Sequence, residues 1–236
     1  MRKNRLLTCG IVFIMCFILC TTPCLAMETG FDTEIVSDDS KSVLINSLDI
    51  DIITEDPLTN GDFSCFDVNS SGEYALGFEN LILVYNADKT FKYGLSFHTT
   101  GSYGIELNDS YLIIYLRRSD AAVSVDSKGN VIEVADIKVT DENEKYWDNF
   151  VDAIERTEGE YTYTARNKIF NPPIGRMGYY SMLIRTGSDG AEDILFDTSS
   201  RFNTSTIILV IGSVLVTLGV TVGLVIIIRQ KKIKIK

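Results

Sequence analysis

Cys65 and His98 are the residues best suited to covalent chemistry downstream of the N-terminal apolar segment. A cysteine paired with a histidine can act as an activated nucleophile. Cys65, however, lies within the alternating segment 63–68, where a buried cysteine packs as a small apolar side chain. One histidine and one such cysteine cannot supply a zinc site rich in His or Cys ligands. We therefore predict no catalytic, cofactor-binding or metal-binding residue and no cofactor.

Asp, Asn and Gly cluster in three short segments, at 67–72, 126–129 and 188–190. A calcium loop requires Asp or Asn at alternating positions, then a glycine and a more distant glutamate. The Asp67-x-Asn69 pattern comes nearest, but none of the segments supplies the full ligand set. The same residue types are those that hairpin turns require. The pattern favours turns, with calcium binding as the alternative.

Two further features could carry chemistry. Arg117 and Arg118 form a basic pair in an acidic region, which favours ion pairs with neighbouring acids and leaves anion binding as the alternative. Carboxylates are numerous, but a glycosidase-type pair is defined by its separation in space, which the sequence does not show. No Gly-x-Ser-x-Gly, His-Glu-x-x-His or phosphate-binding loop occurs. A cell-envelope hydrolase using an unrecognised carboxylate pair is therefore the alternative to a non-enzymatic function.

Two segments indicate a membrane location. Basic residues precede an apolar run at 6–20, and a small-residue pattern ends at Ala26, which predicts a signal peptide over 1–26. Residues 207–228 are uncharged and long enough for a transmembrane helix. The tail 229–236 is basic, so we expect it to be cytoplasmic and the preceding domain to be extracellular, as in a single-pass type I protein of the cell membrane.

The transmembrane segment also carries a Gly-x-x-x-Gly pair, Gly219 and Gly223, with Gly212 on the same helical face. Small residues let two helices approach closely in lipid, so this face could support a homodimer. Glycine is also frequent in spanning helices, so the pattern equally fits a helix that does not pair.

The region between signal and span is strongly acidic. Of the 22 Lys and Arg residues, three lie in the signal and five in the tail, whereas none of the 32 Asp and Glu residues does. The intervening chain therefore has 14 basic and 32 acidic residues, a net charge of −18. This charge repels phosphate backbones, so we predict no nucleic-acid partner. With a single cysteine, the region must also fold without an intramolecular disulfide.

Short strands separated by turns dominate the middle of the chain. Two groups of four are expected, at 63–97 and 103–134, and a third partial copy at 182–196. A first strand is expected within 43–53, after a loose start at 27–41. A helix beginning near Asp141 is expected to place an apolar stripe on one face: Tyr146, Trp147, Phe150, Val151 and Ile154. The irregular loop 171–178 is of the kind that carries binding sites.

The spacing of about 40 residues between groups of four strands is typical of propeller blades. The chain resembles the uncharacterised single-pass surface proteins of Gram-positive bacteria with propeller-blade-like β repeats. We predict a mainly β fold with two to three blade-like antiparallel four-stranded units (or a β-sandwich), one short amphipathic helix and one transmembrane helix. The expected divisions are a signal peptide (1–26), an acidic N-terminal segment (27–60), a β-rich extracytoplasmic domain (61–198), a linker (199–206), the transmembrane helix (207–228) and the tail (229–236). The resemblance implies no known activity, so we expect a non-enzymatic binding or accessory module for a membrane or cell-surface partner.

Overall fold

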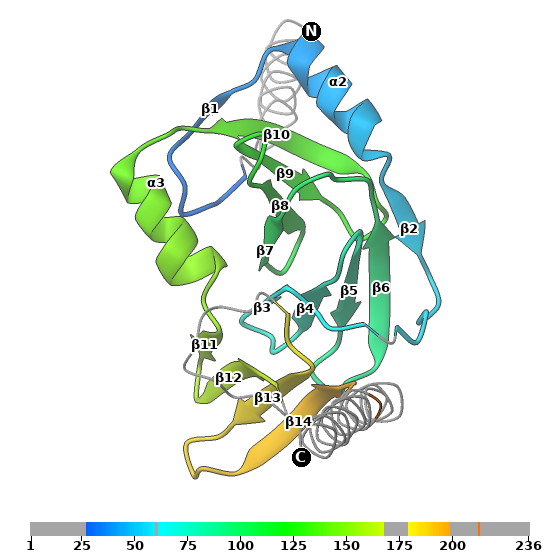
Figure 1. Cartoon of the computed structure of the whole chain (residues 1–236), viewed down its shortest axis with the longest axis vertical. Helices are drawn as coiled ribbons and strands as arrows, with labels where there is room; N and C mark the ends of the chain where they lie inside the picture. Colours follow the sequence, from blue (N-terminus) through cyan, green and yellow to red (C-terminus); the bar gives the residue numbers. More distant parts are fainter. Residues whose placement is uncertain (1–26, 60, 168–178, 199–211, 213–236) are drawn as a thin grey trace, which may run out of the picture. The chain divides into compact units, whose positions relative to one another are not determined.

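The structure, a computed structural model, describes residues 27–59, 61–167, 179–198 and 212 (Figure 1). All strands and helices named below lie in the compact unit that begins at Phe31. The expected signal peptide, linker and tail, the loop 171–178, and the expected transmembrane helix apart from Gly212 lie outside the described residues. Within the part of the chain that the structure describes, no helix has the length and apolar character needed to cross a membrane.

The described chain is mainly β and antiparallel, as predicted, but two of its three sheets have five strands instead of the predicted four, because β1 and β2 add to their edges. The first sheet has the order β2-β6-β5-β4-β3, the second β1-β10-β9-β8-β7 and the third β11-β12-β13-β14. The strands of the first sheet are β2 (Asp51–Ile53), β3 (Cys65–Val68), β4 (Tyr74–Gly77), β5 (Leu81–Tyr85) and β6 (Phe91–Ser96). Those of the second are β1 (Thr33–Ile35), β7 (Tyr103–Leu107), β8 (Leu112–Leu116), β9 (Ala121–Val125) and β10 (Val131–Ile137). The third contains β11 (Glu155–Glu158), β12 (Tyr161–Arg166), β13 (Met182–Thr186) and β14 (Glu192–Asp197).

The same hairpin turn recurs in the first, second and third sheets. In the turn at 126–130, Asp126 N donates to Asn130 O and Gly129 N donates to Asp126 O, both at 3.0 Å. Gly129 has φ +85°, a conformation that glycine adopts without steric cost. The turns at 69–73, 86–90 and 187–191 have the same backbone hydrogen bonds. Each turn is a three-residue loop whose last residue is left-handed. This geometry explains why Asx and Gly residues recur in the sequence.

The strand β5 explains how the first sheet packs on both faces. Its sequence, Leu-Ile-Leu-Val-Tyr, is apolar throughout, and successive side chains of a strand point to opposite faces. Ile82 and Val84 join a core shared with the second sheet, whereas Leu83 and Tyr85 join a core shared with the third. The first sheet therefore lies between the other two.

Two α-helices flank the sheets, and the second continues into a π-helix: α2 (Asp38–Leu48), α3 (Asp141–Tyr146) and η1 (Trp147–Val151). The start of α3 is close to the predicted one, with Thr140 Oγ1 capping Asn143 N at 3.2 Å. The expected apolar stripe ends within η1. Trp147 and Val151 are buried, but Ile154, which follows η1, is 47% exposed. Tyr115 of β8 meets Trp147 edge-on, which places η1 against the second sheet.

The prediction for the N-terminal segment was wrong in two places. Residues 43–48 belong to α2 rather than to a strand, and only Asp51–Ile53 is extended. Ser37 caps α2 by accepting a hydrogen bond from Ser40 N, and Leu48 of α2 is buried in the core shared by the first two sheets. The stretch 27–41 is also not uniformly loose, since β1 pairs with β10.

Candidate functional site

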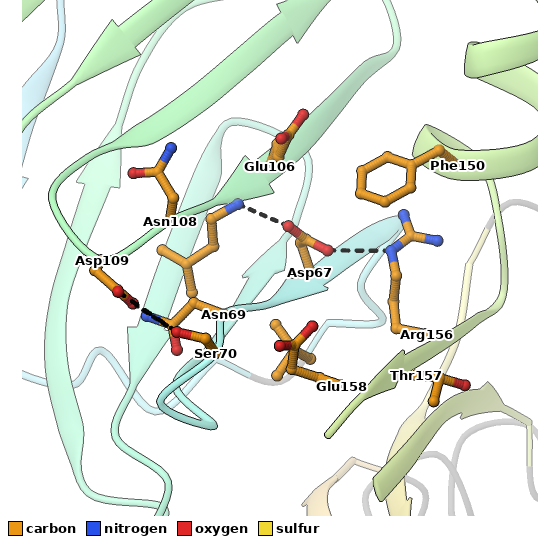
Figure 2. A pocket seen from close by; sticks show the side chains of 12 residues that line it. Asp67, Asn69, Ser70, Glu106, Asn108, Asp109, Phe150, Arg156, Thr157 and Glu158 are labelled. Carbon is orange, nitrogen blue, oxygen red and sulfur yellow. Dashed lines mark hydrogen bonds and ion pairs between the residues drawn. The ribbon is translucent and has the colours of Figure 1, made fainter. Parts of the chain in front are cut away.

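A pocket of about 270 Å³ opens where three strands from three different sheets meet (Figure 2). These strands are β3, β7 and β11, and β3 contacts both of the others. The lining consists of strand ends, the turns that follow them and one aromatic ring from η1: Asp67, Val68, Asn69, Ser70, Glu106, Leu107, Asn108, Asp109, Phe150, Arg156, Thr157 and Glu158.

Asp67 links all three sheets with one side chain. Its Oδ1 accepts from Arg156 Nε of β11 at 3.0 Å, and its Oδ2 accepts from Leu107 N of β7 at 2.7 Å. Asp67 and Arg156 are only 3% and 7% exposed, so this is a buried ion pair. The carboxylate of β3 is therefore a fixed acceptor at the joint between the sheets.

Burial raises the pKa of the Asp67 carboxyl from 3.8 to about 6, because the charged form loses its hydration. The Leu107 N–H and the Arg156 guanidinium oppose this effect, since both favour the carboxylate. Asp67 is consequently ionised at neutral pH and takes up a proton in mildly acidic solution.

Arg156 is held by aromatic rings as well as by Asp67. Its guanidinium carbon lies 4.3 Å from the centre of the Phe150 ring and 5.7 Å from that of Phe66. The Nη1 group donates to Glu155 O at 3.3 Å. The Nη2 group is buried and has no hydrogen-bond partner among the described residues. Buried polar groups without a partner are rare, so this donor marks the position as unusual.

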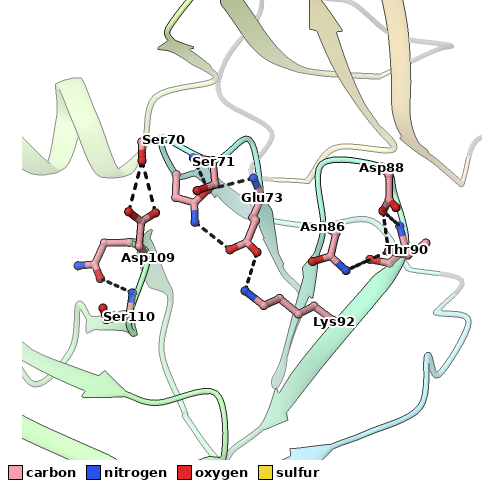
Figure 3. A network of polar contacts seen from close by, with 11 residues as sticks. Ser70, Ser71, Glu73, Asn86, Asp88, Thr90, Lys92, Asp109 and Ser110 are labelled. Atoms are coloured by element: carbon pink, nitrogen blue, oxygen red, sulfur yellow. Dashed lines mark hydrogen bonds and ion pairs between the residues drawn. The ribbon is translucent and has the colours of Figure 1, made fainter.

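Three further carboxylates line the pocket. Glu106 accepts from the hydroxyls of Tyr115 and Tyr146, the latter at 3.0 Å. Asp109, in the turn after β7, accepts from Ser70 Oγ, in the turn after β3, at 3.4 Å (Figure 3). Glu158 ends β11 on the third side. With Asp67, the pocket holds four carboxylates and one guanidinium, so its walls are negatively charged.

Asp67 and Asn69 do not converge as calcium ligands. Asn69 Oδ1 accepts from Ser71 N and Glu73 N, and its Nδ2 donates to Glu73, whose other oxygen pairs with Lys92 at 2.6 Å (Figure 3). Asp126 likewise accepts from Lys128 N and Asn130 N within its turn. Across the described ranges, no group of three or more His, Cys, Asp or Glu side chains could hold a metal ion.

The structure buries Cys65, as the alternating segment predicts. Burial raises the pKa of its thiol to about 12, so the reactive thiolate is suppressed. His98 is exposed and lines a second pocket of about 460 Å³, whose lining does not include Cys65. Arg118 lines that second pocket, whereas Arg117 pairs with Asp152 at 3.1 Å and lies over the Trp147 ring.

Most residues of the candidate site escaped the sequence analysis. Glu106, Arg156 and Glu158 belong to no motif, and Arg156 lies 89 residues from its partner Asp67. Phe150 was assigned to a packing face, whereas in the structure it lies in η1 with its ring over Arg156. The one local signal was Asp67, an acid inside an apolar strand, where a buried charge needs a partner.

Neither a comparison with protein-family models nor one with curated protein sequences finds a match for this chain.

Proposed function

We propose that this protein is a non-enzymatic binding or accessory module, held outside the cell membrane by one helix at residues 207–228. The signal-like N-terminus and the unopposed basic tail support this location. The succession of three antiparallel sheets, two of five strands and one of four, supports the likeness to blade-bearing surface proteins. A protein of this kind acts by holding a ligand or a partner through its outer domain.

The buried donor Arg156 Nη2, in a pocket walled by carboxylates, is the observation that carries the binding function. The pocket is built from the ends of strands in three sheets, so strand pairing and the contacts between sheets position its polar groups. Its polar groups come from elements far apart in sequence, so the fold has to form before the site exists. A preformed concave site with a few convergent polar groups is typical of small-molecule binding.

A ligand screen tests this function. The full-length chain, kept in mild detergent, would be mixed with neutral saccharides, organic acids, amines and soluble cell-wall fragments. We expect at least one class to raise the unfolding temperature, and Arg156→Met to abolish that effect. A panel in which no compound changes the unfolding of the wild type, or in which Arg156→Met responds equally, would contradict a binding role for the pocket.

Location is tested separately. N-terminal sequencing should find the mature chain beginning at Met27, and protease added to intact cells stripped of their wall should cut the domain. A domain protected from that protease would overturn the proposed orientation.

The alternative is an envelope hydrolase, with Asp67 and Glu106 as the carboxylate pair. The raised pKa of Asp67 suits a general acid. However, both oxygens of Asp67 accept from donors fixed by the fold, and Glu106 accepts from two tyrosines. These contacts position the carboxylates rather than leave them to exchange protons with a substrate. Release of soluble fragments from purified cell walls, lost in Asp67→Asn, would support the hydrolase and refute the binding module.

A further inference from the structure

The buried Nη2 group of Arg156 indicates which chemical group one end of a ligand must carry. Nε and Nη1 already donate to Asp67 and Glu155, so only Nη2 lacks an acceptor among the described residues. The second oxygen of Asp67, which would complete a two-pronged pair, accepts from Leu107 N instead. A molecule that binds here gains a charge-assisted hydrogen bond if it carries an oxygen acceptor.

The negative charge of the pocket walls indicates which charge the rest of the ligand must carry. Asp67, Glu106, Asp109 and Glu158 together outnumber the single guanidinium of Arg156. A cleft lined by one sign of charge concentrates ligands of the opposite sign. The attraction for a cationic group therefore comes from these carboxylates.

We propose that the pocket binds a small ligand that carries both an ammonium group and an oxygen acceptor. This inference rests on the proposed function, because it requires that the pocket bind a ligand at all. The oxygen meets Arg156 Nη2, and the ammonium group lies among the carboxylates. The volume of about 270 Å³ lies just below the range of roughly 300–1,000 Å³ typical of ligand pockets. It therefore suits one amino sugar or one amino acid, or the end of a longer molecule.

Phe150 covers the guanidinium that carries the buried donor. Its ring centre lies 4.3 Å from the guanidinium carbon (Figure 2), and Nη2 is out of reach of solvent, so an incoming oxygen requires a neighbouring side chain to move. Phe150 lies in η1, where the chain follows a π-turn closed by Asp152 N donating to Trp147 O at 2.8 Å. Turns of this kind occur frequently at functional sites.

The test compares each amine with a neutral or anionic counterpart. Calorimetric titration of the full-length chain would use D-glucosamine against N-acetyl-D-glucosamine, and L-alanine against N-acetyl-L-alanine. We expect at least about tenfold tighter binding for one of the two amines than for its acetylated counterpart, and a loss of that preference at high salt, because salt screens charges. The two arms tell an amino sugar from an amino acid.

Two rim variants give a matched pair. Glu158→Gln removes a pocket carboxylate and should weaken the amine by roughly two- to fivefold, as for a solvent-accessible ion pair. Glu160→Gln removes an exposed carboxylate two residues further on that does not line the pocket, and should leave binding unchanged. Equal effects of the two variants would mean that only the net charge of the domain matters, which overturns the proposal.

The remaining outcomes distinguish a failure of the amine preference from a failure of the proposed binding function. Binding of an acetylated compound as tightly as its amine, with dependence on Arg156, would overturn the amine preference and leave the binding module intact. If other compounds in the screen bind but neither amine does, the amine preference is likewise overturned and the binding module is left intact. Failure of every compound to bind would overturn both.

Discussion

Replacing Arg156 by methionine should destabilise the domain to an extent that depends strongly on pH. Methionine keeps much of the side-chain volume between the Phe150 and Phe66 rings, and it removes the charge that faces Asp67. Asp67 then remains buried with only backbone N–H groups as partners, chiefly that of Leu107. Without the guanidinium, burial acts on its pKa with less opposition, so the pKa rises further and the carboxyl of the variant keeps its proton to higher pH than in the wild type.

The sign and size of the effect come from that pKa. The pKa of Asp67 is raised on folding, from 3.8 to about 6, so its contribution to stability is full below about pH 4 and lost as the pH rises through about 6. In Arg156→Met the loss continues at higher pH, because folding keeps the carboxyl protonated there. At 1.36 kcal/mol per pKa unit, each unit by which the pKa in the variant exceeds that in the wild type should cost up to about 1.4 kcal/mol at neutral and higher pH. Below about pH 5 this part of the cost should vanish.

Urea unfolding of both proteins at about pH 5, 7 and 8 measures this difference. The control is Arg166→Met, which breaks an exposed pair with Glu192 at 3.1 Å and should cost less than about 1 kcal/mol at every pH. The reasoning would be refuted if the cost of Arg156→Met did not change between about pH 5 and 8. It would equally fail if Arg166→Met showed the same pH dependence.

Three other changes have definite expected outcomes. Gly104→Ala should destabilise the domain by about 1–3 kcal/mol in urea unfolding, because a Cβ there would overlap Val151 of η1; a cost near zero would mean that η1 does not pack on β7. Cys65 should react with a thiol reagent only as fast as the domain unfolds, since its thiol is buried with a pKa of about 12; rapid labelling of the folded protein would contradict this. In a transmembrane association reporter carrying residues 205–229, Gly219→Ile and Gly223→Ile should lower the signal relative to the wild-type segment. Equal signals from the wild type and both variants would refute the homodimer hypothesis.

The sequence predicted the strands well where turns are marked by local chemistry. The expected groups at 63–97 and 103–134 correspond to β3–β6 and β7–β10, because Asx and Gly residues define each hairpin within a few positions. It failed at 43–48, where apolar residues with partial alternation fit a strand as well as a helix. The Ser37 cap and burial of Leu48 against the sheets decide in favour of α2, and the second of these is a tertiary effect.

The candidate site was harder to predict because it depends on contacts between sheets. Asp67 meets Leu107 and Arg156, which are 40 and 89 residues away. Such pairings are fixed by how β3, β7 and β11 come together, and no local pattern encodes that arrangement. Arg156 itself looks like any charged residue of an exposed strand, with Glu155 before it and Thr157 after it.

The residues that connect the three sheets, Asp67, Leu107 and Arg156, also line the pocket, and this couples ligand binding to folding. Asp67 holds β3 to β7 and β11, while Arg156 Nη2, a donor without a partner among the described residues, belongs to a side chain that lines the pocket. A ligand oxygen on that donor would complete the joint, so it should bind the folded domain and not the unfolded chain. At a ligand concentration of about 100 times Kd, such binding stabilises the folded state by about 2.7 kcal/mol.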